Sequence, residues 1–274
     1  MIEDFQDLGI NYSVIEEIKR RDFKSPTTIQ KKSIPVILEG KNVIVAAPTG
    51  SGKTLCYAVC AVQNSKVGNG LQTIIIAPTR ELTKQIATEV ASFSKLRNLT
   101  VHAIYGGQNA STDQYNQIIK SEILVVTPGM LLEHIEKNHL DISNIKTLIL
   151  DEADSLITTE FEENIVKIVE LIPRTRQTLM FSATITPEVA KIANKYMRNP
   201  VKVFAGTKVD TKQLKQYLYE IESDKKLSLL THILATERIA LAIIFTNRAQ
   251  TAEFVEKNLK QNHYEVALLH GEMT

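Results

Sequence analysis

The stretch "NVIVAAPTGSGKTLCYAVC", residues 42–60, decides the fold of this 274-residue chain. It begins as an apolar run, continues as a glycine-rich segment and ends in apolar residues with helical spacing. This order predicts a buried strand, a tight turn and a helix. Gly50 and Gly52 allow the positive φ values and the close backbone approach that a ring of amides around a phosphate requires.

The turn therefore predicts a nucleotide site rather than a purely structural glycine turn. Lys53 begins the helix, whose positive dipole end favours an anion, and its side chain is placed to reach the β and γ phosphates. Thr54 is placed to ligate Mg²⁺. Ala47 stands where the usual pattern has glycine, and it removes no phosphate-contacting group. The candidate nucleotide-binding residues of the turn are Ala47, Pro48, Thr49, Gly50, Ser51, Gly52, Lys53 and Thr54.

A second chemical element is the acidic sequence "TLILDEAD", residues 147–154. An apolar strand delivers Asp151 and Glu152 at its carboxyl end. Asp151 is placed to hold Mg²⁺ directly or through water, and Glu152 to orient or deprotonate an attacking water. Alone, the acidic cluster favours a helix N-cap; with the phosphate turn upstream it favours a hydrolase of ATP or GTP.

The flanking sequence predicts an α/β fold with a parallel, doubly wound sheet. Apolar runs without alternation are separated by amphipathic segments, as expected for strands that helices cover on both faces. In such sheets, ligands lie beyond the carboxyl ends of the strands. Ser13 and Glu16 have capping-box spacing and predict a helix start. The predicted strands are residues 42–47, 73–77, 101–105, 122–127, 147–151 and 177–182, with helices over 80–96 and 161–172.

The β/α rhythm pauses in a polar stretch and then restarts. The predicted organisation is a first domain over 1–204, a linker over 205–213 and an incomplete second domain over 214–274. In that second part the predicted strands are 217–222, 241–246 and 265–269, and the predicted helices are 224–235 and 249–261. Three strands are fewer than the five or six of an average sheet.

The composition limits how the chain could bind nucleic acid and where in the cell it is expected. The 32 basic and 31 acidic residues leave a net charge of +1, so nucleic acid would have to be bound by local groups and backbone amides. Cys56 and Cys60 lie in an apolar helix and are expected to be buried and reduced, not zinc ligands. The chain shows no apolar run of about 20 residues and no signal-peptide start, so we expect an intracellular, soluble protein, cytoplasmic or nuclear and nucleolar, with no membrane contact.

Further motifs follow in a fixed order along the chain. They are "FKSPTTIQ" (23–30), "PTREL" (78–82), "GG" (106–107), "TPG" (127–129), "SAT" (182–184) and "IIFTNR" (243–248). Together with "APTGSGKT" (47–54) and "DEAD" (151–154), they resemble the DEAD-box family of ATP-dependent RNA helicases. The resemblance runs from Phe5 to Thr274 and implies a complete RecA-like domain followed by the beginning of a second one.

The resemblance also implies roles for residues outside the turn. Gln30 would read the adenine edge and Phe23 would stack on its face, which favours ATP over GTP; the alternative for Gln30 is a solvated helix residue. Ser182 and Thr184 resemble the hydroxyl pair that links the nucleotide site to domain closure, with Asp154 bonded into that group. Alternatively, "SAT" is a strand end followed by a helix cap, and both interpretations are compatible.

RNA is the implied partner, bound without regard to sequence through its phosphates. The implied contacts of the first domain are Pro78, Thr79, Arg80, Glu81, Gly107, Thr127, Pro128 and Gly129. Those of the second are Thr246, Asn247, Arg248 and Gly271. Each has a plain alternative, such as a surface cation for Arg80 or a simple turn for Gly107.

Three departures from the family pattern bear on function. Met130 stands where the family usually has Arg, and Asp22 where it commonly has Gly. The family's motif V and arginine-rich motif VI do not follow Thr274. We therefore expect weak binding of ATP and RNA, and little hydrolysis or unwinding, from this chain alone, because an arginine finger contributes roughly 10³–10⁵ in rate.

Two functions from different classes follow. The first is a DEAD-box helicase that hydrolyses ATP with Mg²⁺ to remodel RNA, and some phrases resemble ribosome-assembly members with RNA–protein partners. The second is an ATP-responsive RNA-binding fragment or decoy without catalysis. A GTPase or small-molecule kinase is disfavoured because the guanine signature Asn-Lys-x-Asp is absent.

Overall fold

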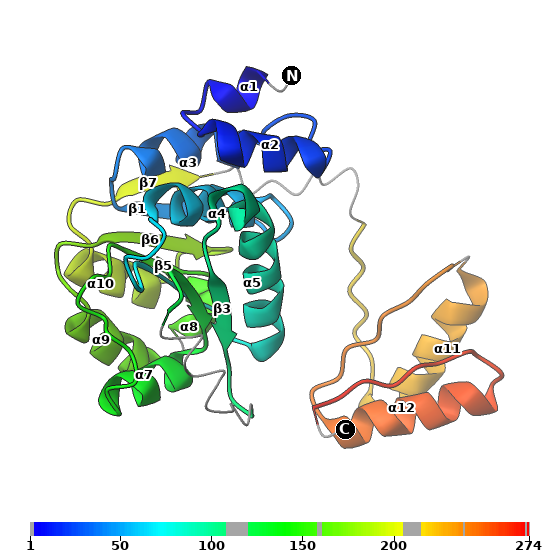
Figure 1. The fold of residues 1–274 in the computed structure, drawn as a ribbon. Coiled ribbons are helices and arrows are strands. Elements are labelled where there is room, and N and C mark those ends of the chain that lie inside the picture. Colours follow the sequence, from blue (N-terminus) through cyan, green and yellow to red (C-terminus); the bar gives the residue numbers. More distant parts are fainter. Residues whose placement is uncertain are drawn as a thin grey trace. The chain divides into compact units, whose positions relative to one another are not determined.

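Seven parallel strands form the centre of the first part of the chain. The computed structural model describes residues 3–107, 120–157, 161–204, 215–237, 239–271 and 273. The sheet order is β3-β4-β2-β5-β6-β1-β7, and every pair is parallel (Figure 1). The strands are β1 Val43–Ala46, β2 Thr73–Ile76, β3 Val101–Ile104, β4 Ile123–Val126, β5 Thr147–Leu150, β6 Gln177–Ser182 and β7 Val201–Phe204. The predicted α/β parallel sheet is confirmed.

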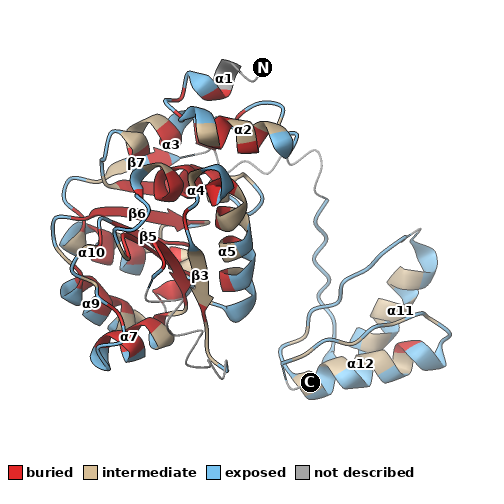
Figure 2. Cartoon of the chain, in the orientation of Figure 1, coloured by how far each residue is buried: buried red, intermediate tan, exposed pale blue. Residues whose placement is uncertain are grey.

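Helices cover both faces of this sheet, which is why its strands are apolar throughout. Val43 and Val45 of β1 belong to one hydrophobic cluster, whereas Ile44 between them belongs to another. The first cluster includes residues of α2 Tyr12–Arg20, α3 Thr28–Leu38, α4 Lys53–Asn64 and α5 Arg80–Ser94. The second includes residues of α7 Pro128–Glu136, α8 Ala153–Leu156, α9 Glu162–Leu171 and α10 Pro187–Tyr196. Figure 2 shows the buried residues gathered on the sheet and on the inner sides of these helices.

The six strands predicted in the first domain are confirmed, but β7 was not predicted. Its stretch was assigned to the polar region before the linker. Val203 is the only buried residue of this strand, and Phe204 is 53% exposed. β7 lies at a sheet edge and pairs on one side only, as β3 does, and both carry a weaker apolar signal than the five inner strands.

The predicted capping box at Ser13 and Glu16 is wrong. Helix α2 begins at Tyr12, and its N-cap Asn11 makes no side-chain cap hydrogen bond. Ser13 is therefore already inside the helix, and Glu16 pairs with Lys19 at 2.7 Å. The capping box of this region lies at the next helix, where Thr27 and Gln30 cap α3 reciprocally.

The chain divides into two compact units, Met1–Lys208 and Val209–Thr274. The predicted linker 205–213 lies outside the described residues, and the predicted domain boundaries stay a prediction. The first unit also holds the short α1 Glu3–Gln6 and the 3-10 helix η1 Lys95–Arg97. The second unit holds the 3-10 helix η2 Ser223–Lys225, α11 Lys226–Thr236 and α12 Ala249–Gln261, which confirms both helices predicted there.

The strands predicted in the second unit, 217–222, 241–246 and 265–269, are not strands in the structure. Residues 239–246 and 264–269 line one pocket with α12, but the described residues of this unit form no strand ladder. Without a ladder and a second covering layer, the side chains of an extended segment stay in contact with solvent. Accordingly, Leu241 is 85% exposed, and Phe245 and Leu269 are each 90% exposed. Among the described residues of this unit, only Leu259 is buried.

Membrane crossing has no support in the described part of the chain, because none of its helices has both the length and the apolar character for a span.

Candidate active site

The candidate site is built where three neighbouring strands end. Strands β5, β6 and β1 are adjacent in the sheet, and Ala46 of β1 pairs with Ser182 of β6. The amide of Ala47 then donates to the Ser182 carbonyl at 3.0 Å. Because parallel strands end at one edge, this order brings together the turn after β1, the acidic pair after β5 and the hydroxyl pair after β6.

The turn after β1 has the backbone that a phosphate loop requires. Gly50 and Gly52 have φ values of 77° and 88°, and Gly52 is the N-cap of α4, which begins at Lys53. Ala47 is fully buried and is not among the residues with positive φ, so alanine fits the first position without strain. Pro48, Thr49 and Gly50 are exposed, and Ser51, Gly52 and Thr54 are partly buried.

Lys53 and Asp151 share one region of the molecule. The Lys53 ammonium donates to the carbonyls of Ala47 at 2.7 Å and Pro48 at 3.3 Å. Tyr57, four residues after Lys53 on the same helix, donates to Asp151 Oδ2 at 2.8 Å. Helix α4 therefore brings Lys53 and Asp151 to one region at the ends of β1 and β5.

Asp151 is held as a buried carboxylate, 5% exposed. Its Oδ2 accepts a hydrogen bond from the Tyr57 hydroxyl at 2.8 Å, and its Oδ1 accepts from the Glu152 amide at 3.0 Å. Burial raises the pKa of Asp151 above its usual value, while these two hydrogen bonds and the charge of Lys53 oppose that rise. The carboxylate is fixed in place by donors on both oxygens.

Tyr57 is a site residue that the sequence reasoning missed. It follows Lys53 by four residues on α4, which places it on the same helix face. That spacing places it near the turn, but its contact with Asp151, 94 residues away in sequence, is visible only in the structure. In the sequence, Tyr57 reads as one more member of an apolar helix.

Glu152 has a left-handed backbone, with φ of 49°. It occupies the N-cap position of α8, but its side chain makes no cap hydrogen bond. A non-glycine residue in this region costs about 1–2 kcal/mol. The alternative of a helix N-cap therefore holds for the position of Glu152 at the start of α8, but its side chain does not cap the helix.

Asp154 joins the turn after β6 to the acidic segment. Its Oδ2 accepts hydrogen bonds from the Thr184 hydroxyl at 2.9 Å and the Thr184 amide at 3.0 Å. Its own amide donates to the Ser182 hydroxyl at 3.1 Å, which in turn donates to the Thr184 carbonyl at 2.6 Å. Burial raises the pKa of Asp154, but the hydrogen bonds outweigh it and the net shift is downward. The alternative for this segment also holds, because the Thr186 side chain caps α10.

Gln30 is buried, 1% exposed, which contradicts the alternative of a solvated helix residue. Its Oε1 accepts from the Thr27 amide at 2.8 Å, and its Nε2 donates to the Gly52 carbonyl at 3.0 Å. The Thr27 hydroxyl donates to the Ser51 carbonyl at 2.9 Å. The start of α3 is thus bonded twice to the phosphate turn.

Phe23 is partly buried and packs on Phe93, with ring centroids 6.5 Å apart. The preceding Asp22 has φ of 57°. Asp22 therefore adopts the left-handed conformation that glycine, the usual residue of the family here, adopts easily. Replacement of glycine by aspartate is thus compatible with a left-handed backbone at this position.

The predicted RNA contacts of the first unit gather at the ends of β2, β3 and β4, which are contiguous in the sheet. Thr79 caps α5, and Thr127 and Pro128 begin α7. The Arg80 guanidinium lies against Gly107, where an added Cβ would be 2.8 Å from Arg80 Nη1. Thr79, Arg80, Glu81, Gly107 and Gly129 are exposed, Pro78 and Thr127 are partly buried, and Pro128 is buried.

The remaining candidates divide between the core and the second unit. Met130 packs against a hydrophobic cluster, so it supplies no phosphate contact in place of the family's arginine. In the second unit, Thr246, Asn247 and Arg248 lead into α12, and the Thr246 hydroxyl donates to the Arg248 carbonyl at 3.1 Å. Gly271 is exposed.

The donor set fits magnesium. Thr54 offers a hydroxyl oxygen and Asp151 a carboxylate, and the described residues contain no group of three or more acidic, histidine or cysteine side chains that would form a closed cage. Mg²⁺ typically uses one or two protein oxygens, substrate phosphates and water. Cys56 and Cys60 are buried free thiols whose pKa values burial raises to about 12, as the sequence led us to expect for unreactive cysteines.

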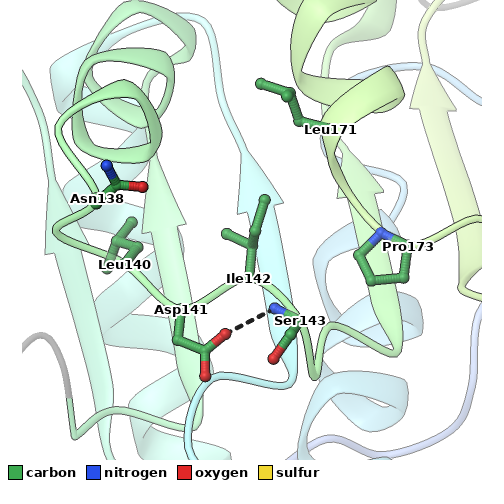
Figure 3. Close-up of a pocket in the computed structure, with 7 residues that line it drawn as sticks. All are labelled: Asn138, Leu140, Asp141, Ile142, Ser143, Leu171 and Pro173. Atoms are coloured by element: carbon green, nitrogen blue, oxygen red, sulfur yellow. Dashed lines mark hydrogen bonds between the residues drawn. The ribbon is translucent and has the colours of Figure 1, made fainter.

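A shallow pocket of about 550 Å³ lies elsewhere (Figure 3). Its residues belong to the segments before β5 and β6, at the amino ends of the strands, and include Asp141, Ser143 and Leu171. The pocket therefore lies at the amino ends of the strands, and the candidate site lies at their carboxyl ends.

Comparison with known proteins finds a matching family model and related proteins. The family model for DEAD/DEAH box helicases matches residues 27–192. The chain is 35% identical over 272 residues to the ATP-dependent RNA helicase CshA of Limosilactobacillus reuteri, covering 98% of this chain and 55% of that protein. It is 32% identical to the DEAD-box ATP-dependent RNA helicase RhpA of Helicobacter pylori strain B128, with the same coverage of 98% and 55%. The chain spans about half the length of these curated relatives.

Two solved structures are similar over 99% of the chain. A DEAD box protein from the hyperthermophile Methanococcus jannaschii gives a TM-score of 0.72 at 30% identity, with 74% of that chain covered. S. cerevisiae Dbp5 bound to RNA and ADP BeF3 gives a TM-score of 0.83 at 25% identity, with 70% covered.

Proposed function

The chain belongs to the DEAD/DEAH box helicase family, and from that premise we propose that it binds ATP with Mg²⁺ and that the whole protein uses ATP to remodel or locally unwind RNA. The observation that supports this proposal is that the turn with Lys53 and the strand end with Asp151 lie at the same ends of β1 and β5, which flank β6, and are linked by the hydrogen bond from Tyr57 of α4 to Asp151. A phosphate-binding turn and an acidic strand end in this arrangement would contact the same ligand.

Adenine selection is supported by the unused capacity of Gln30. A glutamine amide offers two N–H donors and an oxygen with two lone pairs. One donor is used on Gly52 and one lone pair on Thr27, so one of each is left. That pair matches the N7 acceptor and N6 donor of adenine. The bonds that are made also fix which way the amide points.

The chemistry that we propose is hydrolysis of the γ-phosphate. Backbone amides of the turn and Lys53 hold the phosphates, and Glu152 orients or deprotonates the attacking water. Mg²⁺ would be held by Thr54 and Asp151 and would neutralise charge that develops on the phosphate oxygens. Ser182 and Thr184, bonded to Asp154, would relay the state of this site to domain closure.

RNA binding is proposed along the contiguous strand ends that carry Thr79, Arg80 and Thr127. Hydroxyls, exposed amides and one guanidinium suit successive phosphates and ignore base identity. A net charge of +1 suits this local mode of binding. Among the relatives, Dbp5 was solved with RNA and ADP BeF3.

The test is whether ATP tightens RNA binding and whether Lys53→Ala abolishes that effect. We expect the unsubstituted chain to bind a short single-stranded RNA more tightly with a non-hydrolysable ATP analogue and Mg²⁺, measured by fluorescence anisotropy. Lys53→Ala should lose the response, because the ammonium near the phosphates is gone. Lys41→Ala, whose exposed ammonium pairs only with Glu39 among the described side chains, is the control. Normal nucleotide uptake by Lys53→Ala would refute the assignment of the turn.

The activity of the 274-residue chain by itself stays a separate prediction. We expect it to bind without separating a short labelled duplex in the presence of ATP, which matches the alternative of an RNA-binding fragment. Measurable unwinding would contradict that expectation. A role in ribosome assembly, RNA–protein partners and a cytoplasmic or nuclear site of action also stay predictions from the sequence.

A further inference from the structure

Tyr57 lies inside the candidate active site, and the chemistry proposed above gives it no part. Its hydroxyl donates to Asp151 Oδ2 at 2.8 Å, and its side chain is fully buried. Tyr57 follows Lys53 by one helical turn on α4. The helix that begins at the phosphate turn therefore also holds the acidic strand end.

The position of the Tyr57 ring is set by packing. Phe181 of β6 contacts it in an edge-on arrangement, with ring centroids 5.0 Å apart and an interplanar angle of 70°. Phe181 is fully buried too. A tyrosine wedged between a helix and a strand has few rotamers available, so its hydroxyl presents a fixed donor to Asp151.

The same phenol lies beside Thr54. Tyr57 follows Thr54 by three residues on α4, so both side chains lie on one helix face. The hydrogen bond from the Tyr57 hydroxyl therefore ties Asp151 to the helix face that carries Thr54. Each Asp151 oxygen has a second lone-pair direction that these internal hydrogen bonds leave available.

We propose that Tyr57 is a positioning residue for magnesium: its hydroxyl fixes the Asp151 carboxylate beside Thr54 in the orientation that binds the ion or its water. This inference rests on the proposed function. Partners that hydrogen-bond to a metal-ligating group from outside the coordination shell typically contribute about 10- to 100-fold to metal affinity. A tyrosine that only fills the core would affect folding and not the magnesium dependence.

The test is Tyr57→Phe in the 274-residue chain, with a fluorescent, non-hydrolysable ATP analogue as the probe. Titrating MgCl₂ gives the apparent Mg²⁺ affinity of the analogue complex, and EDTA gives binding without the ion. We expect an apparent Mg²⁺ affinity weaker by about 10-fold or more, with binding in EDTA unchanged. Tyr196→Phe is the matched control, because it also removes a tyrosine hydroxyl bonded to a carboxylate, that of Glu170 at 3.0 Å.

A double-substitution cycle tests whether Tyr57 acts through Asp151. Adding Tyr57→Phe to Asp151→Ala should weaken Mg²⁺ no further, because the group that it positions is already gone. A folded Tyr57→Phe chain with unaltered Mg²⁺ dependence would overturn the inference alone, provided that the unsubstituted chain needs Mg²⁺. Mg²⁺-independent uptake by the unsubstituted chain would refute the proposed magnesium site and this inference together.

If Tyr57→Phe does not fold, fluorotyrosine placed at position 57 keeps the hydroxyl and reports on it directly. Its ¹⁹F resonance should shift when MgCl₂ is added to the analogue complex. An unchanged resonance would overturn the inference.

Discussion

The two compact units carry the same β/α rhythm in sequence but reach different structures. In the first, each predicted apolar run became a strand of one sheet, and Leu148 of β5 has no exposed surface. In the second, the run that contains Leu241 pairs with nothing as a strand, and that side chain is 85% exposed. An apolar run becomes a strand where a sheet offers neighbours in the plane and helices above and below it.

The helix ends differ in the same way. In the first unit, side chains of Thr27, Thr79 and Thr186 cap α3, α5 and α10. In the second, the described helices α11 and α12 make no side-chain cap hydrogen bond. Three helices of the first unit, α3, α5 and α10, are therefore specified locally as well as by the core, whereas α2, α4, α7, α8 and α9 have no side-chain cap. The comparison can be tested in three ways.

The largest effect is expected from one leucine in each unit. Leu179→Ala removes a fully buried side chain from β6 and should lower the free energy of unfolding of the first unit by about 2–5 kcal/mol. Leu241→Ala removes an exposed side chain and should leave the free energy of unfolding of the second unit unchanged. Urea unfolding followed by circular dichroism measures both. Equal losses would mean that the second unit is as tightly packed as the first.

An intermediate effect is expected at the start of α3. Thr27→Ala removes the N-cap and should lower the free energy of unfolding by about 1 kcal/mol. Ser13→Ala is the control, since Ser13 lies inside α2 and caps nothing. Thermal unfolding of the two variants side by side separates the two capping assignments. A larger loss from Ser13→Ala would reinstate the box that the sequence predicted.

The smallest effect, of opposite sign, is expected at Asp22. Asp22→Gly should raise the free energy of unfolding by up to about 1 kcal/mol, because glycine adopts the positive φ of this position without strain. Asp22→Ala also removes the exposed ion pair with Lys24 but keeps a Cβ, so it should not stabilise. Differential scanning calorimetry of both variants measures the difference. Stabilisation by alanine as well would assign the effect to charge and not to backbone conformation.

The sequence was a good guide to the sheet and a poorer one to its margins. Five of the six predicted strands were predictable because they lie inside the sheet and are buried along their whole length, whereas β7 has a single buried residue at the sheet edge. The sixth, β3, is the other edge strand and was predicted although only its Ile104 is buried. The strands of the second unit were mispredicted because an apolar sequence indicates that a segment favours burial. It does not show that other segments are present to pair with it and bury it.

The site divides along the same line. Lys53, Thr54 and Asp151 were found because their roles are tied to short local patterns. Tyr57 was missed because its importance depends on Asp151, which is distant in sequence, and only the sheet order brings the two together. Their functional assignments stay predictions until nucleotide binding is measured.

The double attachment of α3 to the phosphate turn has a practical consequence for mutagenesis. Gln30 and Thr27 donate hydrogen bonds to the carbonyls of Gly52 and Ser51, so replacing the glutamine would loosen the turn as well as remove the proposed contact with adenine. A weaker response to ATP in such a variant could come from the loosened turn or from the lost contact with the base. Inorganic tripolyphosphate, which has no base to read, would tell them apart: its uptake should suffer too if the attachment matters, and stay intact if glutamine serves recognition alone.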